Sequence, residues 1–593
     1  MIDRAEGAQA QKKGVGVLLP RVPRYYESIR NARPGFANRW RAMFSRPQPS
    51  RQQDAVRGLA IASENLLNCL MLRNSDAPFD FQLFGGAPVA HFHQWLNSKA
   101  SPPTSRFRVR GVGCLAERGA LDGIGLWYEP QANYSLVYQL RDRFSDIGYP
   151  VVSTVHGTSI HSMLFEHFTR VLLCDTYPQD AFVCSSTQSK AALHRLLDSL
   201  SDTLDRRYGV KRRFAGRYDV IPLPIDTDTL RPGDKTAAKR KLKLPAGCTF
   251  LLYFGLISTL KADLFPCLLA LSECTGELER HDLVFGVAGG GDDEYIRALL
   301  SFARAVGFPV SRLRVFKDPT DALKDTLFQA ADIFTSPADT VQEAFGLTVV
   351  EAMAYGVPQV VADWSGYRDT VRHGVTGFLV PTLWARCDED LRHSGFLLGW
   401  AHDHHALGQS VAMDIEIWKK SVMELVQNTE LRHRMGTASR ERAAQFSMSS
   451  VRQQYFDLWR DLLEQPLAAR NPSLTPQIDT PRYYDWFQDF AAGHATHDLV
   501  LQPVRSRHRQ VVADRAKAVT QGVRIEVLDS VFRAIEVDEH VTLGAVVKSL
   551  EDTVSASTVT WHVMWALKHG LLRGQSATLP ADRTSSIPVF AQD

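Results

Sequence analysis

Residues 332–363, DIFTSPADTVQEAFGLTVVEAMAYGVPQVVAD, contain an apolar strand, a helix and a second apolar strand in succession. The runs DIFTSPA and PQVVAD have the length and apolar character of buried strands. The helix between them is expected to begin near Gly346 or Leu347 and to end at Gly356 with Pro358. Two strands joined through a helix form the repeating unit of a parallel sheet covered by helices.

The same alternation of strands and helices extends through most of the chain from about residue 121. It predicts an α/β fold with parallel sheets covered on both faces. Residues 227–247 interrupt it with proline, glycine and a basic run, which we interpret as a linker with a solvated helix face. We therefore predict two doubly wound, Rossmann-like domains that face a cleft. Before residue 121, VGVLLP and FDFQLFGG are the candidate strands.

Composition excludes several classes of protein. The 593-residue chain has a formal net charge of +3, which does not indicate a nucleic-acid partner. Its eight cysteines form no CxxC pair, so buried reduced thiols are favoured over disulfides or zinc. The first residues lack the apolar region of a signal peptide, and no run reaches the length of a membrane span. We expect a cytoplasmic protein, and a peripheral position on the inner face of a membrane stays open.

Two carboxylates, Glu343 and Glu351, flank the predicted helix start. The free N–H groups of Gly346 to Thr348 would form an anion site suited to a diphosphate. A carboxylate on each flank could accept hydrogen bonds from hydroxyls, and a nucleotide sugar has hydroxyls on both sides of its diphosphate. The alternative is a capping glutamate plus a solvent-facing helical glutamate, which the bare spacing alone would favour.

The surrounding sequence resembles a known family. Residues 343–380, EAFGLTVVEAMAYGVPQVVADWSGYRDTVRHGVTGFLV, resemble the donor-binding segment of family 4 glycosyltransferases, which have the GT-B fold. VHG at 155–157 looks like the family's N-domain histidine motif, and YFGLISTLKAD at 253–263 looks like the start of its C-domain. The resemblance extends over roughly residues 121 to 465.

Together, the sequence pattern and the resemblance predict five parts of the chain. They are an N-terminal, acceptor-side domain at 1–230, a linker at 231–247, a nucleotide-sugar-binding domain at 248–445, a helix crossing back to the N-terminal domain at 446–470, and a linker with an accessory domain at 471–593.

It also implies roles for the donor-site residues. Glu343 would bind hydroxyls of the transferred sugar beside the reacting carbon, and Glu351 would hold the ribose. The phosphates would lie on the backbone of Gly346, Leu347 and Thr348.

A second group of residues would act on the leaving group and the sugar. Lys261, in the loop that begins at Gly255, would neutralise the charge that grows on the diphosphate. His156 would meet the sugar from the other domain, and the alternative for it is a core or turn histidine. No cofactor and no catalytic metal ion are implied, and the donor would be a UDP- or GDP-sugar. We interpret HDHH at 402–405 as solvated rather than metal-binding.

One position departs from the family pattern. The family has an arginine after the glycine and a lysine five residues later, whereas this chain has Gly255-Leu256 and keeps Lys261. The main hypothesis is a retaining, hexosyltransferase-like enzyme that does not depend on a metal ion. The alternative is a weak or inactive transferase-like scaffold or sensor, for which Leu256 is the best support. An epimerase of the same fold is a third interpretation.

The tail beyond about residue 480 lies outside the resemblance. Residues 541–574 predict a helix, a turn and a helix, with Ser555 or Ser557 as a cap and Gly570 near the end, and look like a winged-helix module. Its second helix carries few cations, so protein interaction or acceptor recognition is favoured over DNA binding. The acceptor (a glycan, a lipid-linked glycan, a small molecule or a protein) and the oligomeric state stay open.

Overall fold

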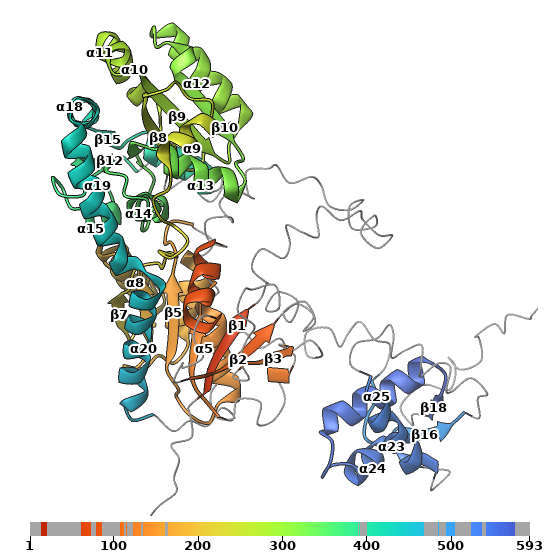
Figure 1. Cartoon of the computed structure of the whole chain (residues 1–593). Coiled ribbons are helices and arrows are strands. Elements are labelled where there is room, and N and C mark those ends of the chain that lie inside the picture. The colour runs from red at the N-terminus through yellow and green to blue at the C-terminus, as the bar shows by residue number, and fades with distance from the viewer. Residues whose placement is uncertain are drawn as a thin grey trace, which may run out of the picture. The chain divides into compact units, whose positions relative to one another are not determined.

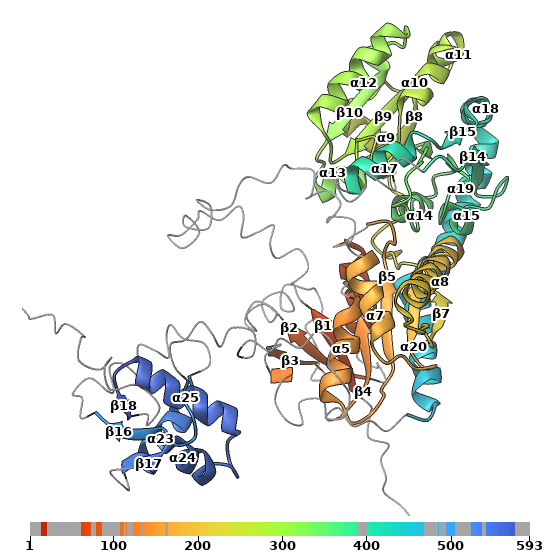
Figure 2. The same cartoon turned by 180° about the vertical axis from the view of Figure 1, so that it is seen from behind.

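In the computed structural model the chain forms two compact units, Met1–Pro476 and Gln477–Asp593. Figures 1 and 2 show the chain from opposite sides. The structure describes residues 14–19, 61–72, 79–85, 107–111, 114–115, 123–131, 134–160, 164–388, 391, 400–467, 484, 494–504, 523–536 and 541–575.

The first domain of the larger unit is built on a seven-stranded parallel sheet with the order β3-β2-β1-β4-β5-β6-β7. The predicted strands VGVLLP and FDFQLFGG are confirmed as β1 and β2. The edge strand β3 was not predicted, because its sequence FRVRG alternates arginine with apolar residues and lacks a continuous apolar run. The strands are β1 (Gly14–Leu19), β2 (Asp80–Gly85), β3 (Phe107–Gly111), β4 (Ile124–Glu129), β5 (Val151–Val155), β6 (Ala181–Cys184) and β7 (Arg217–Val220).

The second domain has a six-stranded parallel sheet with the order β10-β9-β8-β11-β12-β13. The chain runs outward from β8 to β10 and then returns to β11 on the other side of β8. Ligands of doubly wound sheets bind at such a reversal, outside the carboxyl ends of the strands. The strands are β8 (Thr249–Phe254), β9 (Leu283–Gly289), β10 (Leu313–Lys317), β11 (Ile333–Ser336), β12 (Gln359–Ala362) and β13 (Gly377–Val380).

Helices cover both sheets, and the predicted α/β fold with two Rossmann-like domains of the GT-B kind is confirmed. One buried apolar cluster extends through both domains, and a further cluster fills the rest of each domain. The helices named are α5 (Tyr134–Phe144), α7 (Thr169–Leu173), α8 (Thr187–Tyr208), α9 (Lys235–Lys241), α10 (Phe265–Ser272), α11 (Thr275–Arg280), α12 (Asp293–Ala305), α13 (Asp321–Ala330), α14 (Leu347–Ala354), α15 (Tyr367–Thr370), α17 (Trp400–Gly408), α18 (Ile415–Gln427), α19 (Thr429–Ala443) and α20 (Met448–Glu464).

Helix α20 lies against the first domain although it follows the second in the chain (Figure 1). The ring of Phe456 lies 5.3 Å from that of Phe79, and the Tyr455 ring lies 5.7 Å from that of Tyr128. The hydroxyl of Tyr455 also forms a 2.8 Å hydrogen bond with Thr154 Oγ1 on β5. Aromatic pairs and a buried hydrogen bond therefore join the end of this unit to the sheet of its first domain.

The described part of the smaller unit contains three helices and a three-stranded antiparallel sheet with the order β17-β16-β18. The predicted helix–turn–helix is confirmed: Ser555 caps α25 by accepting a hydrogen bond from the Thr558 N–H, and Gly570 follows the helix with φ +66°. These elements are β16 (Val500–Pro503), α23 (Ile525–Glu536), β17 (Val541–Thr542), α24 (Leu543–Ser549), α25 (Ala556–Lys568) and β18 (Leu572–Gln575). Across the described ranges, no helix combines the length and the apolar character needed to cross a bilayer.

Candidate active site

The loop between β11 and α14 forms the base of the site. Gly346 is the N-cap of α14 and has φ +94°. A Cβ there would lie 2.3 Å from Tyr367 Cε1, so both the backbone conformation and the close ring require glycine. The amides of Gly346, Leu347 and Thr348 have no acceptor within the described part of the chain. These amides lie where the helix dipole favours an anion.

Glu343 is the first of the two predicted carboxylates, and it is 8% exposed. Its Oε2 forms an ion pair with Lys261 Nζ and accepts a 3.1 Å hydrogen bond from the Tyr367 hydroxyl. The Tyr367 hydroxyl also forms a 2.7 Å hydrogen bond with Ser336 Oγ at the end of β11. Tyr367 thus links the carboxylate to the sheet, and sequence reasoning missed this tyrosine.

The surroundings of Glu343 keep it ionised. Burial alone would raise its pKa, but Lys261 and the Tyr367 hydroxyl bring the pKa below its ordinary value. A negative charge held beside a lysine and close to a helix start can interact with hydroxyls of a ligand and with positive charge that develops on it.

Lys261 belongs to the loop that follows β8. The Gly255 amide donates to the Ala288 carbonyl at 3.0 Å, and the Tyr253 hydroxyl donates to the Leu256 carbonyl at 2.8 Å. The backbone of this loop passes close to Gly289, because a Cβ on Gly289 would lie 1.7 Å from the Gly255 carbonyl oxygen. The backbone at Leu256 is therefore fixed, while Lys261 extends from the same loop to Glu343.

Glu351, the second predicted carboxylate, also forms an ion pair with a lysine. It is 5% exposed, and its Oε1 forms a 2.7 Å ion pair with Lys324 Nζ from α13. Its Oε2 is buried without a hydrogen-bond partner in the described structure. Sequence reasoning missed Lys324, because a lysine in an amphipathic helix is ordinarily a solvated residue.

His156 follows β5 in the first domain. Its Nε2 lies 2.7 Å from the Pro130 carbonyl oxygen, so Nε2 carries the proton and donates. Burial lowers the pKa of His156 to about 4, which leaves the ring neutral near pH 7. Its buried Nδ1 lacks a hydrogen-bond partner among the described residues and is a free acceptor.

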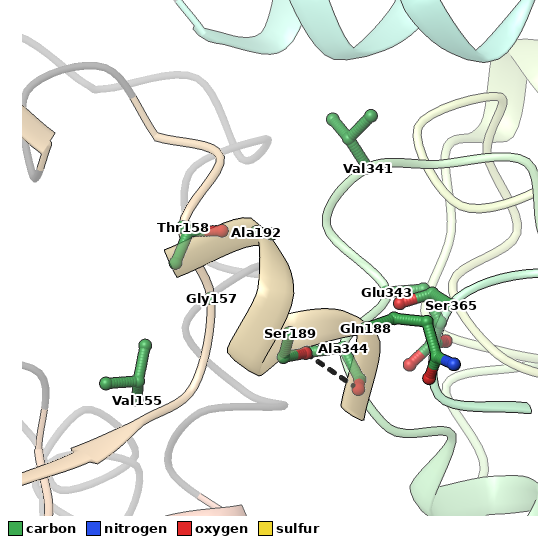
Figure 3. Close-up of a pocket in the computed structure, with 10 residues that line it drawn as sticks. All are labelled: Val155, Gly157, Thr158, Gln188, Ser189, Ala192, Val341, Glu343, Ala344 and Ser365. Atoms are coloured by element: carbon green, nitrogen blue, oxygen red, sulfur yellow. Dashed lines mark hydrogen bonds between the residues drawn. The ribbon is translucent and has the colours of Figure 1, made fainter. Parts of the chain in front are cut away.

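A hollow lies between the two domains (Figure 3). Gly157, next to His156, and Thr158 lie on its first-domain side, and Glu343 lies on its second-domain side with Ser365. Of the predicted site residues, Glu343 lines this hollow, whereas His156, Lys261 and Glu351 are not among its lining residues. Its lining residues are Val155, Gly157, Thr158, Gln188, Ser189, Ala192, Val341, Glu343, Ala344 and Ser365.

The start of helix α8 binds directly to the loop that carries Glu343. The hydroxyls of Ser186 and Ser189 donate to the Ala344 carbonyl at 2.7 and 3.1 Å. The Thr187 hydroxyl donates to Asp369 Oδ1 at 2.8 Å, and its amide donates to Oδ2 at 2.6 Å. Four polar contacts therefore fix the first domain next to Glu343. Sequence reasoning missed these contacts, because they depend on how the two domains pack.

The expected solvation of the histidines in helix α17 is wrong for one of them. HDHH at 402–405 was predicted to be solvated, but His404 is 1% exposed and its Nε2 lies 3.1 Å from the Ser159 carbonyl oxygen. The neighbouring His405 forms a 2.9 Å hydrogen bond with Thr259 Oγ1. The helix joins the loop after His156 to the loop of Lys261, which the sequence pattern could not reveal. Within the described ranges, no group of three potential metal ligands occurs.

Residues 234–386, which include Lys261, Glu343 and Glu351, match the family model described as "Glycosyl transferases group 1". This part of the chain is therefore similar in sequence to the glycosyl transferases of group 1.

Two curated relatives are similar to part of the chain. The D-inositol 3-phosphate glycosyltransferase of Geodermatophilus obscurus is 32% identical over 249 residues, 40% of this chain and 52% of that protein. The enzyme of the same name from Nocardia farcinica is 33% identical over 180 residues, 29% of this chain and 38% of that protein. The chain thus spans about half or less of the length of these relatives.

Among solved structures, the chain is similar to Anabaena HepE in complex with UDP. The TM-score is 0.47 at 15% identity, with 76% of this chain and 100% of that chain covered.

Proposed function

We propose that the chain is a retaining glycosyltransferase that moves a sugar from a UDP- or GDP-sugar to an acceptor. The diphosphate would bind the free amides at the start of α14, where the helix dipole stabilises an anion. Glu351 lies one turn further along α14 and would accept hydrogen bonds from the ribose. Glu343 and the interdomain hollow would receive the sugar on the opposite flank.

His156 would help to hold that sugar from the first domain. Its neutral ring has a free acceptor at Nδ1, which suits a sugar hydroxyl as donor. Because the hollow is lined by both domains, sugar binding would depend on the contacts of Ser186 and Thr187 that join them.

The proposed chemistry needs no group beyond the substrates and this site. The bond between the anomeric carbon and the diphosphate oxygen breaks, and its electron pair stays with the diphosphate. The acceptor oxygen bonds to the same face of that carbon, and its proton passes to a phosphate oxygen. Lys261 would stabilise the charge that develops on the leaving diphosphate, a kind of contact worth about 3 kcal/mol in the transition state.

The observation that carries this proposal is the Glu343–Lys261 ion pair beside the free amides of α14. The family match over residues 234–386 supports sugar transfer as its use. The test is to titrate UDP, GDP and ADP against the full chain while its thermal unfolding is followed, and then to identify products from the matching sugar nucleotides by mass spectrometry. A stabilising nucleotide and a transferred sugar are expected.

A second candidate is a protein that binds nucleotide sugars without turnover. Leu256 favours it, because an apolar side chain stands where an arginine would share the diphosphate charge with Lys261. This candidate predicts stabilisation by a nucleoside diphosphate without release of nucleotide from any donor.

The smaller unit would serve acceptor recognition as a winged-helix-like docking module. The helices and small sheet of its described part, and the exposed side chains of Trp561 and Met564 on α25, support this role. We place the enzyme in the cytoplasm, and its acceptor would be a glycan, a lipid-linked glycan, a small molecule or a protein.

A further inference from the structure

Each of the two site carboxylates is paired with one lysine. Glu343 pairs with Lys261, and Glu351 pairs with Lys324. The four charges cancel in the structure without a ligand. A nucleoside diphosphate brings two or more further negative charges to the start of α14, so its binding requires cations that are already committed to the carboxylates.

The pair between Lys324 and Glu351 leaves no accessible carboxylate oxygen for a ribose. Oε1 of Glu351 is occupied by Lys324, and Oε2 is buried without a partner in the described structure. A ribose hydroxyl therefore competes with Lys324 for Oε1, or reaches Oε2 after a shift of the side chain. A buried carboxylate that loses its counterion must gain other hydrogen bonds, and the hydroxyls of a ribose would provide them.

Lys324 has a second set of contacts that can hold it when the pair opens. Its Nζ lies 5.4 Å from the centre of the Phe254 ring and 6.0 Å from that of Phe328. Phe254 directly precedes Gly255, so Lys324 lies beside the loop that carries Lys261. From Glu351 the start of α14 is about 6 Å along the helix axis, a distance that rotation of a lysine side chain can cover.

We propose that Lys324 is a displaceable counterion: it neutralises Glu351 while the site is empty and turns to the diphosphate when a nucleoside diphosphate binds. The ribose hydroxyls then replace Lys324 on Glu351. Lys324 thereby becomes the second cation of the diphosphate site, where Leu256 provides none. This inference rests on the proposed nucleotide-sugar function and assigns a residue to it that the family resemblance does not.

The exchange has a consequence that a purely structural lysine would not have. A nucleoside without phosphates that displaces Lys324 from Glu351 gives the lysine nothing in return. A nucleoside diphosphate opens the same pair and then binds the released ammonium. Lys324 should therefore strengthen the preference for the diphosphate over the nucleoside, rather than strengthen both equally.

The experiment compares affinities of the full chain for UDP, GDP and ADP with those for uridine, guanosine and adenosine. In Lys324→Met the preference of the favoured diphosphate over its nucleoside should fall about tenfold or more, as expected for loss of a charged hydrogen bond. Lys324→Arg should retain most of the preference. Lys419→Met, which removes an ion-paired lysine of α18, is the matched control and should leave the preference unchanged.

Thermal unfolding of each variant without ligand checks the fold, and Lys324→Gln replaces the methionine variant if that variant does not fold. Equal losses for diphosphate and nucleoside would overturn the exchange and leave the proposed function standing. Failure of the wild-type chain to bind any of the diphosphates would overturn the proposed function and this inference with it.

Discussion

Lys261 and Glu343 form an ion pair at the point where the two loops following β8 and β11 meet, and Tyr367 holds the same carboxylate from α15. The two charged residues lie 82 positions apart in the chain. Their pairing places an ionised carboxylate and an ammonium beside the free amides of α14. A leaving diphosphate gains negative charge, and the sugar that it leaves gains positive charge. The ammonium of Lys261 and the carboxylate of Glu343 supply the opposite charge for each.

The first prediction concerns turnover at Glu343. Glu343→Gln should lower the rate of sugar transfer about a hundredfold or more while nucleoside diphosphate affinity changes by less than about fivefold, because the carboxylate interacts with the sugar side. Steady-state rates and calorimetric titration of the variant measure the two effects. Glu416→Gln, which alters an exposed partner of Lys419 on α18, is the matched control. A loss of nucleotide affinity as large as the loss of rate would refute the assigned role.

Glu343 also predicts a pH dependence of stability. The pKa of its carboxyl is below the ordinary value in the folded chain, because Lys261 and Tyr367 outweigh burial. The carboxylate therefore stabilises the fold above the unfolded pKa of about 4.3, and this contribution is lost as pH falls through the lower folded value. The difference in Tm between the wild type and Glu343→Gln should be greatest near neutral pH and should shrink below about pH 4. A difference that grows toward low pH would contradict the ion pair.

Glu351 should act on the nucleotide instead. Glu351→Gln keeps the shape of the side chain but weakens its acceptor, so affinity for the nucleoside diphosphate should fall about tenfold or more. The rate at saturating donor should change much less, since the ribose lies on the other flank from the reacting carbon. Equal effects of the glutamine variants of Glu343 and Glu351 on nucleotide affinity would contradict this division.

A substitution at Leu256 tests whether the diphosphate site lacks a cation. In Leu256→Arg, donor turnover should rise if no other residue replaces the missing guanidinium, and it should change little if Lys324 already provides the charge. The double variant Lys324→Met with Leu256→Arg separates these cases, because the arginine should then restore activity lost with the lysine. A fall in activity in both backgrounds would indicate that the loop, fixed by Tyr253 at the Leu256 carbonyl, accepts no larger side chain.

Some parts of this site could be predicted from the sequence, and others could not. The helix start at Gly346 and both glutamates follow from the local pattern of strand, helix and terminating Gly356, and family resemblance assigned Lys261. The partners Tyr367 and Lys324, and the contacts from Ser186 and Thr187, depend on packing between distant elements. No local periodicity encodes such contacts, and His404 was assigned wrongly for the same reason: burial of a polar side chain depends on what folds over it.

Removal of the smaller unit should leave the chemistry at the donor site intact. A chain that ends at Pro476 retains the whole larger unit and should stay folded. It should still hydrolyse the donor slowly but lose transfer to the natural acceptor. Transfer that stays intact while the oligomeric state changes would assign the smaller unit to assembly instead of acceptor docking.

The most direct measurement is donor cleavage by the full chain. UDP-, GDP- and ADP-sugars are incubated with the wild type and with Glu343→Gln, and released nucleoside diphosphate and free or transferred sugar are quantified by mass spectrometry. We expect release from one donor class by the wild type and a rate about a hundredfold or more lower for the variant. No release from any donor, together with no thermal stabilisation by UDP, GDP or ADP, would contradict it.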